Sequence, residues 1–234
     1  MLHLSGGTLM DWLTFWDAKA SAGNDFQATG RGLMDVPGYL HTVAEGVRIL
    51  DLHQGDQLAD IGCGAGLIAM TLAPWLERIY AVDISPALID RARKNLAGVN
   101  NVHLKVGSLA KLPLTDVFVD KLLAYSVLQY LGDESNVSQA LREVARVLKP
   151  GGGALLAANP DPARRLAYEA VVRERADQAA AEREITLLDD LLWLPGPRLL
   201  ELAAAAGLNA RIEPIDARIW QHFYMFDLVL EKSK

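Results

Sequence analysis

Cysteine is almost absent from this sequence, since Cys63 is the only one among 234 residues. A single cysteine excludes an internal disulfide and any zinc site built mainly from cysteines, and it fits a reducing, cytoplasmic location. The histidines and acidic residues show no HExxH or similar ligand spacing. We therefore predict no catalytic metal.

An excess of basic charge and long apolar runs are also missing. The chain has 23 Lys and Arg against 29 Asp and Glu, and because phosphate contacts need a basic surface we predict no nucleic-acid partner. No run approaches the ~20 apolar residues that cross a bilayer, and the first residues lack the features of a signal peptide. We expect a cytoplasmic protein with no membrane partner. The basic cluster Arg91-Ala92-Arg93-Lys94 lies in a helical pattern and is interpreted as a solvent-exposed face.

Short apolar runs alternate with helical patterns from about residue 57 onward. The expected strands are Gln57–Ile61, Arg78–Val82, Val102–Val106, Val119–Ala124, Ala154–Ala158, Leu208–Ile215 and Phe223–Glu231. The expected helices between them are Ala65–Trp75, Pro86–Leu96, Glu134–Leu148 and Pro197–Ala206. Strand–helix repetition with short connections predicts an α/β fold with a doubly wound, parallel sheet. The last two strands lie close enough in sequence to form a hairpin.

Two regions fall outside this alternation. Residues 1–50 carry Trp12, Phe15 and Trp16 at helical spacing, which predicts the buried stripe of an amphipathic helix. The functional alternative is a lid over a ligand, with Asp17 and Arg31 as polar contacts. Residues 160–195 are too long for an ordinary connection, so we interpret them as an insertion, with one charged helix expected over Arg164–Glu184.

Three alternate glycines directly follow the first apolar strand, in Leu58-Ala59-Asp60-Ile61-Gly62-Cys63-Gly64-Ala65-Gly66. Asp83 ends the second strand, 21 residues after the first glycine. Glycines let a ligand approach bare backbone, and an acid at this spacing accepts hydrogen bonds from a ribose. The pair predicts a ligand that contains a nucleoside, and we interpret Cys63 as a small filler in the turn.

The glycines alone leave the identity of the ligand open. Counted from Gly62, a G-x-G-x-x-G pattern places Leu67 at its third glycine position and fails. Counted from Gly64, the pattern reads Gly64, Gly66 and Ala69, which an NAD(P)-dependent oxidoreductase would accept.

Later blocks resemble the class I S-adenosylmethionine-dependent methyltransferases, in order and at the family's spacing, across about residues 55–160. After the glycine turn and Ala81-Val82-Asp83-Ile84-Ser85, these blocks are Gly107–Pro113, Val119–Leu131 and Leu141–Gly152. The resemblance implies a seven-stranded sheet whose last strand is antiparallel, S-adenosyl-L-methionine as cofactor, and methyl transfer. It implies a methyltransferase domain over residues 51–234, a helical cap or lid over residues 1–50, and a substrate cover over residues 160–195.

The same resemblance assigns cofactor binding to residues that follow strand ends: Asp60, Gly62, Gly64, Gly66, Asp83, Ile84, Ser108, Leu109 and Ser126. It implies that Gly62 and Gly64 face the methionine part of the cofactor, whose ammonium group lies near Asp60. Asp83 is expected to bind both ribose hydroxyls.

For the adenine, the resemblance implies an apolar face from Ile84 and an edge contact from Ser108 and Leu109. Family members commonly carry Asp where this chain has Ser108, so a hydrogen bond is retained there without a charge. Ser126 is expected to line the passage between the sulfonium and the substrate.

Substrate-binding candidates follow from position alone: Trp16, Arg31, Gln129, Tyr130, Trp220 and His222. Packing is the alternative interpretation for Gln129 and Tyr130, and an ordinary turn histidine is the alternative for His222. We predict a small-molecule acceptor and assign no catalytic base. Two other classes stay open: a non-catalytic module that binds the cofactor, and an NAD(P)-dependent oxidoreductase, which a final antiparallel strand beside strand five would exclude.

Overall fold

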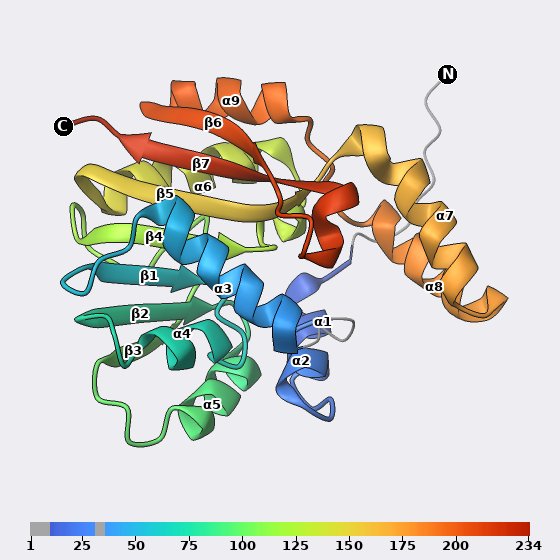
Figure 1. Cartoon of the computed structure of the whole chain (residues 1–234), viewed down its shortest axis with the longest axis horizontal. Helices are drawn as coiled ribbons and strands as arrows, with labels where there is room; N and C mark the ends of the chain where they lie inside the picture. Colours follow the sequence, from blue (N-terminus) through green and yellow to red (C-terminus); the bar gives the residue numbers. More distant parts are fainter. Residues whose placement is uncertain (1–9, 31–35) are drawn as a thin grey trace.

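A single seven-stranded sheet forms the centre of the molecule in a computed structural model of the chain, which describes residues 10–30 and 36–234 (Figure 1). Its strands are β1 (Gln57–Ile61), β2 (Arg78–Asp83), β3 (Val102–Val106), β4 (Val119–Tyr125), β5 (Leu148–Pro160), β6 (Leu208–Pro214) and β7 (Met225–Lys232). The spatial order is β3-β2-β1-β4-β5-β7-β6. Strands β1 to β5 pair in parallel, whereas β7 is antiparallel to both β5 and β6. The predicted doubly wound sheet with an antiparallel last strand is confirmed.

Helices cover both faces of the sheet. On one face lie α3 (Val36–Leu50), α4 (Leu67–Leu72) and α5 (Pro86–Asn95), and on the other lie α6 (Glu134–Val147) and α9 (Gly196–Ala205). Successive strand residues point to opposite faces, so Leu122 and Leu123 of β4 join different apolar clusters. Because both faces are buried, the strands are apolar without clean alternation.

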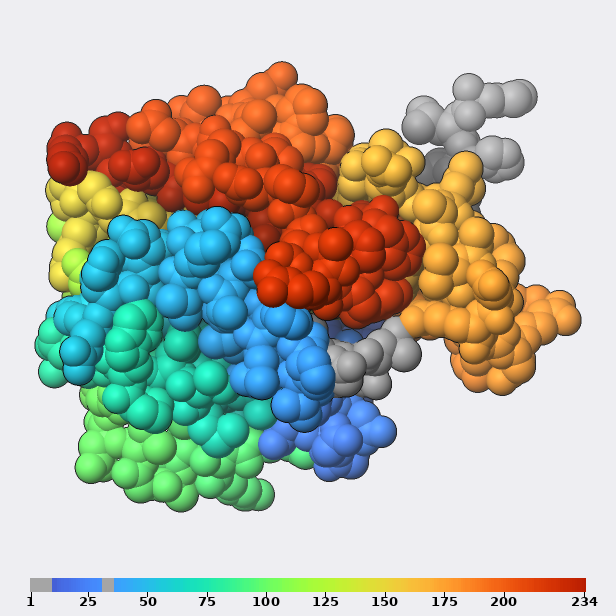
Figure 2. Space-filling view, in the orientation of Figure 1, coloured from blue at the N-terminus to red at the C-terminus, as the bar shows by residue number. Residues whose placement is uncertain are grey.

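The insertion after β5 is a helical hairpin, so the single helix predicted over Arg164–Glu184 is wrong. It consists of η2 (Pro162–Arg164), α7 (Arg165–Arg175) and α8 (Gln178–Asp189). The break has a local cause: Ala176 is extended, and the Asp177 side chain caps α8 by accepting from the Ala180 N–H at 2.9 Å. The hairpin projects from the body of the molecule at the right of Figure 2.

The N-terminal segment is attached to the start and the outer side of α5. It comprises α1 (Trp12–Lys19) and α2 (Asp25–Ala28). Arg91 binds Asp25 with 2.5 Å between Nε and Oδ1, and its Nη1 donates to the carbonyl oxygens of Ala20 and Ala22 at 2.9 and 2.7 Å. The interpretation of Arg91 as part of a solvent-exposed face is therefore wrong, because its partners lie about 70 residues away in sequence, beyond the reach of a helical pattern. Within the described ranges, no helix has both the length and the apolar character that a bilayer crossing needs.

Asp227 carries a buried carboxyl group on strand β7, between β5 and β6. Its Oδ1 accepts from the Ala158 N–H at 2.8 Å, and only 7% of the residue is exposed. Burial raises the pKa of Asp227 to about 6, a rise that one backbone hydrogen bond does not cancel. The folded protein therefore binds this proton more tightly than the unfolded chain, in which the pKa of an Asp is about 3.9.

Replacing Asp227 with Asn should stabilise the protein above pH 6. The favourable contribution of the wild-type carboxyl is complete below its unfolded pKa and is lost as the pH rises through about 6. Chemical denaturation should therefore show Asp227→Asn gaining up to about 3 kcal/mol over wild type at pH 8, with the difference vanishing near pH 4. Glu231→Gln, at an exposed position of the same strand, is the control and should show no such trend. A pH-independent difference for Asp227→Asn would contradict the assignment.

Candidate functional site

The glycine turn lies at the carboxyl edge of the sheet, where β1 ends and α4 begins. Gly62 and Gly64 both have positive φ, +71° and +55°, a conformation that side chains rarely adopt. Added Cβ atoms would stand 2.5 Å from Val127 at Gly62 and 2.5 Å from Thr29 at Gly64. Glycine at these two positions therefore permits both the backbone conformation of the turn and the close approach of Val127 and Thr29.

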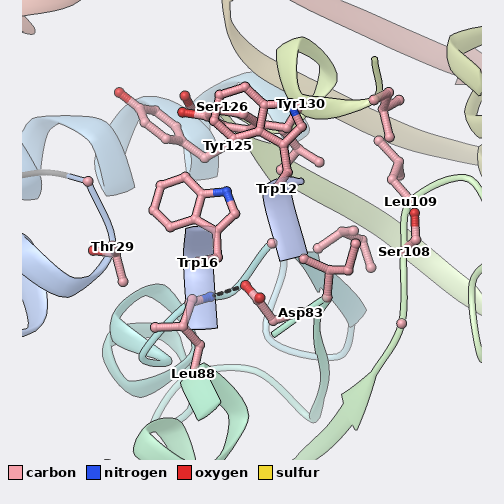
Figure 3. A pocket seen from close by; sticks show the side chains of 18 of the residues that line it. Trp12, Trp16, Thr29, Asp83, Leu88, Ser108, Leu109, Tyr125, Ser126 and Tyr130 are labelled. Carbon is pink, nitrogen blue, oxygen red and sulfur yellow. Dashed lines mark hydrogen bonds between the residues drawn. The ribbon is translucent and has the colours of Figure 1, made fainter. Parts of the chain in front are cut away.

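Asp83, at the tip of β2, holds this turn in place. One carboxyl oxygen accepts from the Gly64 N–H at 2.8 Å (Figure 3). The other accepts from the Ser85 N–H at 2.9 Å. The side chain is buried yet lines the adjoining cavity, so a ligand in that cavity would lie beside the carboxylate.

A first cavity lies at this edge of the sheet and contains about 910 Å³, counting its open mouth. The predicted residues that line it are Trp16, Gly62, Gly64, Asp83, Ile84, Ser108, Leu109, Ser126 and Tyr130. Asp60 and Gly66 are not among its lining residues. Asp60 is 1% exposed at the end of β1, and Gly66 packs against Leu96 and Ala92 of the neighbouring helix region.

Aromatic rings from α1 close the cavity opposite the glycine turn. Trp12 and Trp16 meet the ring of Tyr130 edge-on, with 4.7 and 5.3 Å between ring centroids (Figure 3). No side chain of α1 is buried, so the aromatic stripe does not form the expected buried face. Two of its three rings line the cavity instead, and Phe15 packs edge-on against Trp16.

A second cavity of about 720 Å³ adjoins the first and shares four lining residues with it: Gly30, Ser126, Tyr130 and Gln221. The helical hairpin α7–α8 contributes Tyr168, Glu184 and Leu188 to its wall. The 3-10 helix η3 (Trp220–Phe223) contributes Trp220 to the same wall. Gln129, from the 3-10 helix η1 (Leu128–Tyr130), also lines this cavity. The insertion therefore lies over the same edge of the sheet as the glycine turn.

Of the remaining two substrate-binding candidates, the structure describes only His222. His222 is exposed, with its Nδ1 2.9 Å from the carbonyl oxygen of Ile219, and it lines neither cavity. Arg31 lies outside the described residues.

Ser126 stands where the two cavities meet. It has φ +59°, uncommon for a serine and typical of strained functional positions. Its N–H donates to the Ala157 carbonyl oxygen at 2.8 Å, and its hydroxyl accepts from Gln129 Nε2 at 2.6 Å. The strained backbone is held by these two contacts.

Several lining residues carry no sequence signal that predicts them. Thr29 and Leu88 line the first cavity, Tyr168 and Tyr224 line the second, and Gln221 lines both. Gln221 is a partial exception, because its neighbour Trp220 was predicted to lie near the substrate. Across residues 10–30 and 36–234, no three His, Cys, Asp or Glu side chains gather in a way that could hold a metal ion.

Comparison with known proteins agrees with this geometry. Residues 59–156 match the model of the methyltransferase domain family. The malonyl-[acyl-carrier protein] O-methyltransferase of Serratia marcescens is 34% identical over 110 residues, which cover 46% of this chain and 41% of that protein. The chain spans less than half the length of the first curated relatives it matches.

Solved structures share the fold at lower identity. A Haloferax volcanii protein, solved in complex with a methyltransferase activator, has a TM-score of 0.71 at 22% identity, over 94% of this chain and 98% of that one. The magnesium protoporphyrin IX methyltransferase of Synechocystis PCC 6803, solved with bound S-adenosylhomocysteine, has a TM-score of 0.63 at 18% identity, over 93% of each chain.

The position of β7 decides between the two cofactor classes that the glycines left open. An antiparallel strand between β5 and β6 is the arrangement implied for a methyltransferase, and it excludes the NAD(P)-dependent alternative. Residues 59–156 thus match the methyltransferase domain family, and the sheet around them has the fold of the class I, S-adenosylmethionine-dependent methyltransferases.

Proposed function

We propose that this protein transfers a methyl group from S-adenosyl-L-methionine to a small-molecule acceptor. The observation that carries the proposal is the junction at Ser126: a cavity lined by bare glycines and an acid continues there into a second, separately walled cavity. A cofactor site and an acceptor site that meet at one point are what a direct transfer requires.

The residues of the first cavity fit the cofactor. Gly62 and Gly64 leave backbone open to the methionine part, and the Asp83 carboxylate lines the same cavity at the position expected for the ribose hydroxyls. Ile84, 39% exposed, offers an apolar surface for adenine, and Ser108 offers a hydroxyl at its edge. When bound, S-adenosyl-L-methionine supplies a methyl group already activated by a positively charged sulfur.

The side chains then have mainly to orient the acceptor and to exclude water. Trp12, Trp16 and Tyr130 cover the first cavity, while the α7–α8 hairpin encloses the second. Positioning of this kind contributes roughly 7–11 kcal/mol in intramolecular reactions. No side chain is assigned here as a general base.

The enclosed second cavity supports a small acceptor. Its space of about 720 Å³, counting the open mouth, leaves room for a small molecule. The relatives named above act on different acceptors, as their names state, so the acceptor has to be inferred from this chain's own walls. A non-catalytic cofactor-binding module would not need a second cavity that opens beside Ser126.

Selective stabilisation by the cofactor product tests the proposal directly. S-adenosylhomocysteine should raise the melting temperature of the purified protein by several degrees at saturating concentration, because a ligand that binds only the folded state stabilises it. NAD at the same concentration is the control and should leave the melting temperature unchanged. Stabilisation by NAD alone, or no stabilisation by S-adenosylhomocysteine, would refute the proposed cofactor.

Asp83→Asn should weaken the binding of S-adenosylhomocysteine by about 10- to 100-fold. Hydrogen bonds to a charged acceptor contribute about 1.5–3 kcal/mol each, and every 1.4 kcal/mol is tenfold in affinity. Calorimetry measures the change, and circular dichroism checks that the glycine turn has not unfolded with the loss of charge. An unchanged affinity in a folded variant would contradict the assignment of the ribose to Asp83.

Arg91→Ala should loosen the cap formed by α1 and α2, since this side chain binds Asp25 and three backbone carbonyl oxygens of the segment between them. We expect faster proteolysis within residues 10–30 and weaker binding of S-adenosylhomocysteine, because Trp16 and Thr29 line its cavity. Arg93→Ala is the matched control: two residues further along α5, Arg93 pairs with the exposed Asp90 and with no other acid among residues 10–30 and 36–234. Equal behaviour of the two variants would contradict the lid role of the cap.

A further inference from the structure

The second cavity is aromatic and contains no positively charged lining residue among those that the structure describes. Its rings belong to Tyr130, Tyr168, Trp193, Trp220 and Tyr224, and its one charged lining residue is Glu184. Aromatic faces carry negative electrostatic potential, so rings and a carboxylate together favour a cation.

The polar groups of this wall have spare capacity as hydrogen-bond acceptors. Gln129 is 2% exposed, and its Nε2 donates to Ser126, but its Oε1 has no partner among the described residues. The Oε1 of Gln221, which lines both cavities, is in the same situation. A buried acceptor without a donor costs free energy, so a ligand that donates hydrogen bonds would complete this site.

Glu184 has one oxygen committed and one available. The Tyr168 hydroxyl donates to Oε1 at 2.5 Å, and Arg175 binds the same oxygen. Within the described part of the chain, no hydrogen bond is made to Oε2. The carboxylate is held in place by Tyr168 and Arg175 and can still accept from a ligand.

Among the described residues, three cations lie around this cavity without lining it. Arg175 lies over the ring of Trp220, 5.1 Å from its centroid, and Arg165 lies over the ring of Trp193 at 5.6 Å. Lys19 lies over the rings of Phe15 and Trp16. Arg175 is paired with Glu184, so its charge is already matched by this carboxylate.

We propose that the methyl acceptor is an amine nitrogen, held in the second cavity as a positively charged or strongly donating group by Glu184, Gln129 and the aromatic rings. This inference rests on the proposed methyl transfer. The acceptor ammonium first releases one proton to solvent. The nitrogen lone pair then forms a bond to the methyl carbon while the sulfur–carbon bond breaks, and the electron pair of that bond stays on sulfur. The products are an N-methylammonium, S-adenosylhomocysteine and the released proton.

The charge balance of this step suits the wall. Positive charge leaves the sulfur and develops on the nitrogen, where aromatic faces and a carboxylate stabilise it. A carboxylate or phosphate-bearing acceptor would lie against aromatic faces and the Glu184 carboxylate, and the Arg175 guanidinium is already paired with Glu184. The same wall that binds an amine therefore discriminates against an acid.

Three small probes of similar shape and different charge test the site. They are choline, its neutral carbon isostere 3,3-dimethylbutan-1-ol, and the anion 3,3-dimethylbutanoate, each titrated into the protein saturated with S-adenosylhomocysteine. Calorimetry, with the fluorescence of Trp193 and Trp220 as a second readout, should show choline binding at least tenfold more tightly than the alcohol and the anion most weakly. Equal binding of choline and the alcohol, tighter binding of the anion, or no binding of choline would overturn the proposal.

Variants of Glu184 and Trp220 test whether the wall of the second cavity causes the preference for choline over the alcohol. Glu184→Gln should weaken choline binding at least fivefold and leave binding of the alcohol unchanged. Glu182→Gln, at an exposed position of α8 where the carboxylate accepts from Gln178, should change neither. Because Glu184 also supports the hairpin, Trp220→Leu is a second variant: it keeps apolar bulk, removes the ring, and should likewise weaken choline alone. Equal losses for Glu182→Gln and Glu184→Gln would overturn the proposal.

Turnover separates this inference from the proposed function. Release of S-adenosylhomocysteine with primary or secondary amines, but not with the matching alcohols or carboxylic acids, is the expected result. Release with alcohols or acids alone would overturn the amine assignment and leave methyl transfer standing. Failure of the protein to bind S-adenosylhomocysteine at all would overturn the proposed function itself.

Discussion

The hydrogen bonds from Gly64 and Ser85 to the carboxylate of Asp83 are the constraint on which the site depends. They fix the tip of β2 against the turn that follows β1, so two neighbouring parallel strands end at one defined point. The turn can be reached there only because Gly62 and Gly64 lack side chains, which lets Val127 and Thr29 approach it from two other sides. Strand ends, cap and cavity meet around one carboxylate.

The cap is attached to the structural unit that carries this carboxylate. Asp17 of α1 binds the Ser85 hydroxyl and accepts from the Ala87 N–H at 3.2 Å, at the first turn of α5. A carboxylate is favourable at a helix N-terminus because the peptide dipoles leave partial positive charge there. Ser85 therefore connects Asp83 to Asp17: its N–H donates to one acid and its hydroxyl to the other. Movement of the cap would therefore shift Ser85 and, through it, the Asp83 carboxylate at the position proposed for the ribose.

The sequence predicted those features whose causes are local or follow from chain connectivity. Strand–helix repetition, the glycine turn and the helix start at Pro86 are encoded within a few residues, and the resemblance to a family added the antiparallel β7. The contacts of Arg91 and the break at Asp177 were not predicted. The first depends on partners far away in sequence, and the second was hidden because charged helix formers continue on both sides of a capping residue. The cytoplasmic location stays a prediction.

The two cavities are built from different parts of the chain, and this separation bears on specificity. The glycine turn and the ends of β1 to β4 form much of the first, whereas the insertion and η3 supply most of the second. Gln129 joins them, because its side chain donates to Ser126 while its backbone carbonyl accepts from Leu192, just beyond α8, at 2.9 Å. Substitutions in the hairpin can therefore reshape the acceptor wall without touching Asp83 or the glycines. One route by which they can affect the cofactor runs through Gln129 and the strained backbone of Ser126, so acceptor choice and cofactor position are coupled at this pair.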